Sequence, residues 1–523
     1  MTESRVKKTF LNARVNLIFY FLNLVLSFFS RKIFLDSLGA DFIGLTGTLY
    51  NLLGFLNIVE LGIGSAVGYV LYKPLYDKDQ SQINEIISVF GYLYRWVGII
   101  ILVGGVILSL FLPLIFSDIS ISMPVVFAAF YSFLASSLIG YFINYKQTLL
   151  SADQRNYVVT AYFQTANILK IIIQLISAYY TRNYYLWIFI EFFFGVIYTF
   201  ILNWKINQVY PWLKSNIRCG RQLLKKYPRI ITLTKQVFVH KIGSFAQFEL
   251  SPFLIYAFAS LQSVAYYANY TLLTSKLSGL FSNFLGSSAA GVGNLIAEGA
   301  KDKIMRVYWE LLSIRFYIVG VSAFFLYNVI PPFITLWLGS EYVMSNNILI
   351  LVIIGFALSI LRGTTDDFIN GHGLYRDVWA PLAESAIFII VALIGGSLWG
   401  LEGVLLGGIV SLLIIVYGWK PYFLFRHALH ISLRVYILGF LKHIFCIIIG
   451  GGLFYILHSL VNFSLPESSW IRLILYAAFV GGALFIIQFA TLYIGSCGMR
   501  DFVSRFLSKT SLKKATSPIH RKS

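Results

Sequence analysis

Hydrophobic runs of about 20 residues recur along almost the whole chain, separated by short polar gaps. A run of this length with few charges is what a helix needs to cross the roughly 30 Å hydrocarbon core of a bilayer. The chain is therefore expected to be an all-α polytopic membrane protein. The pattern predicts about fourteen transmembrane helices, at residues 15–35, 42–71, 91–116, 124–145, 157–180, 185–204, 237–260, 265–296, 311–336, 348–363, 379–399, 403–422, 435–457 and 471–494.

The composition agrees with a membrane protein. Hydrophobic residues make up 58% of the chain and charged residues 12%, about half of the roughly 25% that is usual in a soluble domain. A formal net charge of +19 could indicate a nucleic-acid-binding protein, but the cations lie in loops and tails beside the apolar runs. There they set topology and attract anionic headgroups. We expect membrane lipids, and no nucleic acid, among the partners.

Lysine and arginine are concentrated in every second gap and at both ends of the chain. The strongest cluster lies in residues 205–235, between the sixth and seventh runs, and contains no acidic residue. By the positive-inside rule, these gaps and both termini face the cytoplasm. The apolar residues within 214–229 allow two interpretations of this segment, an amphipathic helix on the inner leaflet or a solvated loop.

The chain also contains an internal repeat, in which residues 42–98 align with residues 266–320 at an offset of 222 to 224. Both halves would start on the same side of the membrane, and transporters use such parallel repeats around a shared cavity. Five segments are predicted: an N-terminal six-helix lobe (1–204), a basic cytoplasmic linker (205–235), a C-terminal six-helix lobe (236–430), helices 13 and 14 (431–497), and a basic cytoplasmic tail without regular structure (498–523).

Several charged residues fall inside the predicted spans, where each costs on the order of 3 kcal/mol unless it faces a cavity or a partner. They are Glu60, Arg95, Lys170, Glu191, Glu249, Lys276, Arg315, Arg362, Glu384 and Lys442, with Arg31 and Lys32 at the outer end of the first span. We select seven as candidate substrate-binding residues of a cavity: Arg31, Glu60, Arg95, Glu249, Lys276, Arg315 and Arg362. The alternatives are interhelical ion pairs, or snorkelling of the arginines to the interface.

Cationic groups in a membrane cavity suit one class of substrate, a lipid joined to a sugar through phosphate or diphosphate. Arginine and lysine bind phosphate by charge-assisted hydrogen bonds. Acidic partners would prevent permanent trapping of the anion and could bind a coupling ion, H⁺ or Na⁺. No other cofactor is expected. The sequence has no Walker loop, zinc spacing or nucleophile elbow, so neither a metal site nor catalytic residues are predicted.

Seven motifs, taken together, resemble a known family. They are SLGADFIGL at 37–45, VELGIGSA at 59–66, LYKPLYDKD at 71–79, LLSADQRNY at 149–157, FINGHGLYRD at 368–377, PLAE at 381–384 and GLEGVLLG at 400–407. In order and spacing they resemble the Wzx-type polysaccharide flippases of the multidrug/oligosaccharidyl-lipid/polysaccharide exporter superfamily. The resemblance covers nearly the whole chain. Arg31 matches a position that is often basic in the family, and Glu60 one that is often acidic.

The resemblance implies two six-helix lobes in a V-shaped exporter fold, opening alternately to either side, plus two extra C-terminal helices. It implies that the chain is not an enzyme. It also implies transfer of an undecaprenyl-diphosphate-linked oligosaccharide, such as an O-antigen, capsule or exopolysaccharide repeat unit, across the bacterial cytoplasmic (inner) membrane. A glycan polymerase of the same pathway is a possible partner.

Three alternatives stay open. A peptidoglycan-precursor flippase and a drug/cation antiporter belong to the same superfamily, although an antiporter for cationic drugs would favour a more acidic cavity. The third alternative is a membrane polysaccharide polymerase or glycosyltransferase. Such enzymes usually need a large outward loop, whereas the longest loop here is the inward segment 205–235. The pair Asp366-Asp367 would be the candidate metal ligands of that enzyme.

Overall fold

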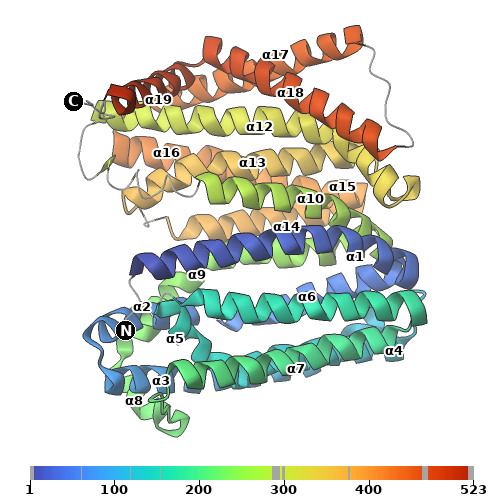
Figure 1. Ribbon diagram of the computed structural model, residues 1–523, viewed down its shortest axis with the longest axis vertical. Helices are drawn as coiled ribbons and strands as arrows, with labels where there is room; N and C mark the ends of the chain where they lie inside the picture. The colour runs from blue at the N-terminus through green and yellow to red at the C-terminus, as the bar shows by residue number, and fades with distance from the viewer. Residues whose placement is uncertain are drawn as a thin grey trace, which may run out of the picture. The chain divides into compact units, whose positions relative to one another are not determined.

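The computed structural model describes residues 5–285 except 61, 118 and 154, then 292, 295 and 296, and finally 301–374, 377–461 and 469–515. In these residues the chain is built from helices joined by short turns, with no β-strand. It divides into two compact units, Met1–Ala265 and Tyr266–Ser523. Figure 1 shows the long helices of each unit lying roughly side by side.

The described residues of the first unit that precede α10 (Leu261–Leu285) form nine α-helices. They are α1 (Arg5–Leu56), α2 (Ile63–Asp77), α3 (Gln80–Ile115), α4 (Met123–Phe142), α5 (Gln147–Ala152), α6 (Asn156–Thr181), α7 (Tyr184–Val209), α8 (Gly220–Lys226) and α9 (Pro228–Phe258). Asp79 and Asn183 cap α3 and α7 by accepting hydrogen bonds from the amides of Gln82 and Leu186. Such caps satisfy the free amides of a helix start.

The first two predicted spans share the long helix α1, and the second span is broken. A kink at Gly39, with φ of 82°, separates the two spans within α1. The second span then passes through a 3-10 turn, Asn57–Glu60, and restarts at α2 behind Gly62, whose φ is 94°. A Cβ at Gly62 would lie 2.7 Å from the backbone oxygen of Thr234 in α9. Glycine is therefore required here both for the turn and for helix contact.

The second unit begins within α10. Its further described helices are α12 (Lys301–Trp337), α13 (Asn346–Gly371), α14 (Trp379–Trp399), α15 (Leu401–Ser411), α16 (Lys420–Leu424), α17 (Leu433–Val461), α18 (Trp470–Gly495) and α19 (Cys497–Ala515). Two π-helical segments, Leu412–Trp419 and Phe425–Leu429, flank α16, so 401–429 forms one irregular span. Helices α14 and α15 pack backbone to backbone, because a Cβ at Gly403 would lie 1.9 Å from the oxygen of Gly395.

The predicted fold class is confirmed. Eleven helices in the described part of the chain are long and apolar enough to cross a membrane. One of these, residues 18–60, contains the first predicted span and the start of the second. Helices α9 and α10 fall below this criterion, but they occupy the seventh and eighth predicted spans as far as residue 285. Each of the fourteen predicted spans thus consists mainly of helix in its described part, with the break of the second span at residues 57–62.

The repeat is visible in the order of the helices. At the predicted offset, α3 corresponds to α12, α4 to α13 and α6 to α14. The packing partners also correspond, since α3 packs on α4 and α4 on α7, while α12 packs on α13 and α13 on α15. Helices α17 and α18 pack on each other and on α12. They are the two additional C-terminal helices of the prediction.

Two details differ from the predicted segments. Helix α9 packs against α1 and α2, and it falls in the first compact unit rather than with residues 266–523. The prediction of an unstructured tail is wrong for residues 498–515, which belong to α19 and pack on α12. Arg505 anchors α19 by pairing, at 2.6 Å, with the buried carboxylate of Glu310. The remaining tail residues lie outside the described part.

The basic segment between the sixth and seventh spans is docked rather than free. The amides of Lys214 and Asn216 donate to the side chains of Asn84 and Ser88 on α3, at 2.6 and 2.8 Å. Glu85, also on α3, accepts hydrogen bonds from Lys226 and Tyr227, both at 2.6 Å. Burial and the Glu85 carboxylate raise the pKa of Tyr227.

Candidate functional site

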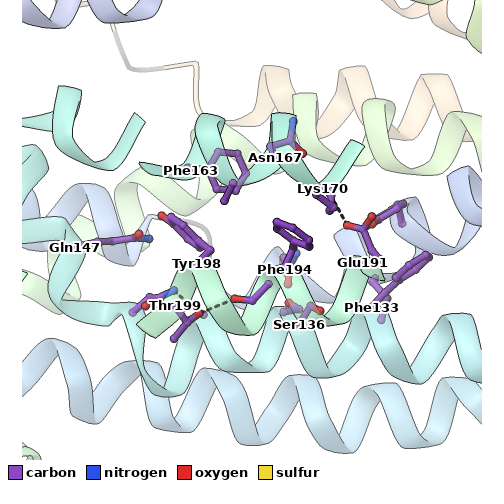
Figure 2. A pocket seen from close by; sticks show the side chains of 18 of the residues that line it. Phe133, Ser136, Gln147, Phe163, Asn167, Lys170, Glu191, Phe194, Tyr198 and Thr199 are labelled. Atoms are coloured by element: carbon purple, nitrogen blue, oxygen red, sulfur yellow. Dashed lines mark hydrogen bonds and ion pairs between the residues drawn. The ribbon is translucent and has the colours of Figure 1, made fainter. Parts of the chain in front are cut away.

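A cavity of about 710 Å³ lies inside the first unit, between α1, α4, α6 and α7 (Figure 2). Residues one helical turn apart line it from each helix, as expected for the inner face of a bundle. They are Tyr50, Leu53, Gly54, Asn57, Phe133, Ser136, Ser137, Gly140, Asn144, Gln147, Val159, Phe163, Ala166, Asn167, Lys170, Glu191, Phe194, Gly195, Tyr198 and Thr199.

Small side chains create this space. The inner faces of four helices carry small residues where larger apolar residues would otherwise fill the bundle. These small residues are Gly54, Ser136, Gly140, Ala166 and Gly195. A Cβ built at Gly140 would meet no atom within 4 Å. The bundle therefore holds open volume in its interior.

An ion pair lies at one end of the cavity. The ammonium of Lys170 on α6 is 2.6 Å from a carboxylate oxygen of Glu191 on α7. The second oxygen of Glu191 accepts from Gln174 at 3.0 Å, and Tyr50 interacts electrostatically with the same carboxylate. Lys170 and Glu191 are both largely buried, so each charge depends on the other for compensation.

Neutral polar groups occupy the other end. The amide of Asn144 donates to the Thr199 hydroxyl at 3.1 Å and accepts from Asn203 at 3.0 Å. Asn57, in the break of the second span, accepts from the Tyr141 hydroxyl at 3.0 Å. Tyr141 therefore connects the cavity wall to the predicted site residue Glu60.

Glu60 lies at the broken point of the second span. Its carboxylate accepts hydrogen bonds from Tyr94 on α3 and, at 3.3 Å, from Tyr141 on α4. Breaks in transmembrane helices expose backbone groups, and transporters place binding sites at them. Glu60 does not itself line the cavity.

The other predicted residues of the first unit lie elsewhere. Arg31 on α1 donates to the backbone oxygen of Ala265 at 2.7 Å, at the start of α10. Arg95 is exposed on α3, beside the exposed Trp96. Glu249 belongs to the helix α9, but its side chain lies outside the described residues.

In the second unit, Lys276 is half-buried on α10. Arg315 on α12 is buried and donates to the backbone oxygen of Ile360 at 3.1 Å and to Asp367 at 3.0 Å, both on α13. Arg315 is therefore held by an interhelical ion pair, one of the alternatives that the sequence left open.

Arg362 also belongs to an interhelical cluster. It pairs with Asp366 at 2.9 Å and lies 3.9 Å from Glu384 on α14. Lys420, placed between the two π-helical segments, reaches the second oxygen of Asp366 at 2.6 Å. Asp366 and Asp367 thus bind basic side chains, and the described residues contain no group of His, Cys, Asp or Glu arranged to hold a metal ion.

None of the seven selected residues lines the cavity of the first unit, and their assignment as substrate-binding residues stays a prediction. The sequence named Lys170 and Glu191 as charges inside the membrane but did not select them. Their signal was the presence of opposite charges on two consecutive antiparallel helices. The amides and hydroxyls of the cavity gave no signal, because residues such as Asn144 and Ser136 are common in helix contacts.

No protein-family model matches the chain, and no curated protein matches it in sequence. Solved structures do match in fold. The lipid II flippase MurJ, in an inward closed conformation, has a TM-score of 0.63 and 17% identity, over 91% of this chain and 98% of its own.

An inward-facing multidrug resistance MATE family transporter of the MOP superfamily has a TM-score of 0.56 and 14% identity, over 80% of this chain and 99% of its own. The Vibrio cholerae MATE transporter VcmN has a TM-score of 0.50 and 16% identity, over 81% and 99%. The chain is a multi-pass membrane protein with the fold shared by the flippases and transporters of the MOP superfamily.

Proposed function

We propose that this protein flips a polyprenyl-diphosphate-linked oligosaccharide across the bacterial cytoplasmic membrane by alternating access, with both termini in the cytoplasm. In this role it is a transporter and not an enzyme. The repeat unit of an O-antigen, capsule or exopolysaccharide is the proposed cargo, and a polymerase of the same pathway is the proposed partner.

One observation carries the proposal. The match to the lipid II flippase extends over 91% of the chain, whereas the match to the MATE transporter extends over 80% while covering nearly all of that transporter. A larger share of this chain therefore aligns with the flippase than with the MATE transporter. The chain has two additional helices, α17 and α18, packed on α12. The flippase is named for a lipid-linked substrate, and this supports a lipid-linked substrate here.

The chemistry of the chain also supports an anionic lipid-linked substrate. The predicted cavity residues include five cations, Arg31, Arg95, Lys276, Arg315 and Arg362. Arg315 and Arg362 pair with Asp367 and Asp366, respectively. The proposed phosphate-binding cations are therefore Arg31, Arg95 and Lys276. Arginine binds diphosphate in a bidentate manner. The cavity of the first unit, in turn, contains one acidic residue, and Lys170 neutralises it. This balance is less suited to a cationic drug.

A binding measurement tests the proposal. The purified full chain is titrated with undecaprenyl diphosphate, undecaprenol and the lipophilic cation ethidium, and its unfolding temperature is recorded. We expect stabilisation by the diphosphate that rises with concentration, as for any ligand that binds only the folded state. Stabilisation by ethidium alone would favour the drug/cation antiporter. Displacement of bound undecaprenyl diphosphate by lipid II at equal concentration would favour the peptidoglycan-precursor flippase.

A further inference from the structure

We propose that the cavity of the first unit binds sugar rings of the cargo, separately from the site that binds its diphosphate. This inference rests on the proposed function and adds to it where the glycan is held.

The lining combines aromatic faces with neutral polar groups. Phe163 from α6 and Phe194 and Tyr198 from α7 lie around the same space in Figure 2. Sugar rings present flat C–H faces that pack on aromatic rings, and hydroxyls that need both donors and acceptors. Side-chain amides and hydroxyls supply both kinds of group.

Some of these polar groups are without partners in the protein. The Ser136 hydroxyl oxygen is buried and has no hydrogen-bond partner. In the described part of the chain, Gln147 and Tyr198 also line the cavity without a hydrogen bond from their side chains. Buried polar groups are normally satisfied, and the Ser136 oxygen is an exception inside the wall. Gln147 and Tyr198 are half-buried and border the cavity, so their side chains are the ones that can reach the hydroxyls of a ligand.

The charge of the cavity excludes the diphosphate as its occupant. Among the described lining residues, Lys170 and Glu191 alone carry ionised side chains, and they neutralise each other at 2.6 Å. A diphosphate would approach Glu191 without excess positive charge to compensate it. A neutral polyol has no such penalty.

The volume fits a ligand of this kind. Small-molecule sites usually measure about 300–1,000 Å³, and this cavity, at about 710 Å³, falls in the middle of that range. An acyl chain would also fit by size, but it would leave the amide of Gln147 facing hydrocarbon.

The test fills the cavity without disturbing its walls. Gly140→Leu places a side chain in open space inside the cavity, and Gly452→Leu places the same side chain in open space on the exposed face of α17. Tyr198→Phe is a milder variant that removes only a hydroxyl. Thermal unfolding of each purified full-length variant establishes that it is folded.

Affinity is then measured for undecaprenyl diphosphate and for three versions of it that carry glucose, galactose or N-acetylglucosamine. For the unmodified protein we expect at least one sugar-bearing lipid to bind tenfold or more tightly than the bare diphosphate. Gly140→Leu should abolish this preference and keep the affinity for the bare diphosphate. Tyr198→Phe should reduce the preference severalfold, and Gly452→Leu should keep it.

Two results would overturn the sugar site while leaving the proposed function intact. One is equal binding of the bare lipid and of all three sugar-bearing lipids. The other is a sugar preference that persists in both folded cavity variants. Failure of every lipid to bind, including the bare diphosphate, would instead contradict the proposed function itself.

Discussion

The guanidinium of Arg315 occupies the space that a side chain at Gly363 would need. A Cβ built on Gly363 would lie 2.4 Å from Nη1 of Arg315. The absence of that Cβ allows α12 to place its arginine against α13, where Arg315 reaches Asp367 at 3.0 Å. This glycine is thus part of the ion pair, although it has no charge.

Gly363→Ala should therefore weaken the Arg315–Asp367 pair. Moving one partner of a buried ion pair out of contact costs about 3–5 kcal/mol, partly offset by the roughly 1 kcal/mol that alanine gains over glycine in a helix. We expect a clear drop in unfolding temperature. Gly355→Ala on the same helix, where a Cβ meets nothing within 4 Å, is the matched control and should stabilise slightly. Equal behaviour of the two variants would contradict this explanation.

The ion pair Lys170–Glu191 predicts that substitutions of its two residues have strongly coupled effects on the free energy of unfolding. Lys170→Met leaves the Glu191 carboxylate uncompensated in the bundle, and the loss should be roughly 3–5 kcal/mol. Adding Glu191→Gln removes the unpaired charge, so the double variant should recover most of the stability. Denaturant unfolding of the single and double variants gives the coupling energy. Additive losses would show that the two charges do not compensate each other.

The hydrogen bonds to Glu60 predict that removing a tyrosine hydroxyl destabilises the protein by different amounts at Tyr94 and Tyr131. Tyr94 and Tyr141 donate to its carboxylate, and a hydrogen bond to a charged group contributes about 1.5–3 kcal/mol. Tyr131 shares a hydrogen bond only with the neutral Ser109, at 2.8 Å, which is worth about 0.5–1.5 kcal/mol. Tyr94→Phe should thus destabilise more than Tyr131→Phe in thermal unfolding. The reverse order would contradict the role of Glu60 as the acceptor of these hydrogen bonds.

The substitution Arg505→Ala should weaken the docking of helix α19 on α12. Arg505→Ala leaves the buried carboxylate of Glu310 without the ion pair that anchors α19 on α12. We expect a clear loss of stability, because a buried carboxylate is left without its counter-charge, and faster proteolysis after residue 497. Glu310→Gln in the same chain should restore much of the loss. Arg500→Ala, an exposed arginine on the same helix, is the control.

The sequence predicted the helices because their signal is local. Length and hydropathy of each run determine whether it can span a bilayer, and all fourteen runs are mainly helical where they are described. The break of the second span was less visible, since it depends on how Gly62 packs against Thr234. That contact joins α2 to α9 and has no counterpart in the local pattern.

The partners of the charged residues could not be predicted for the same reason. Arg315 and Lys420 reach acids of α13 through the packing of α12, α13 and the irregular span 401–429. Arg362 differs, because Asp366 lies four residues further along the same helix. The sequence identified charges at membrane depth, but periodicity does not tell which helices face each other. The C-terminal helix was missed because its composition is polar, and its docking depends on the distant residue Glu310.

Transport of a lipid-linked glycan tests the central claim most directly. The full chain is reconstituted in liposomes, and an undecaprenyl-diphosphate-linked oligosaccharide with a fluorescent sugar is placed in both leaflets. A membrane-impermeant reductant that quenches the fluorophore irreversibly is then added outside. We predict that fluorescence is quenched completely in liposomes with protein and by about half in empty ones, because the protein brings inner-leaflet glycan to the outside. Quenching that stops at half in both, with a folded protein present, would contradict the account.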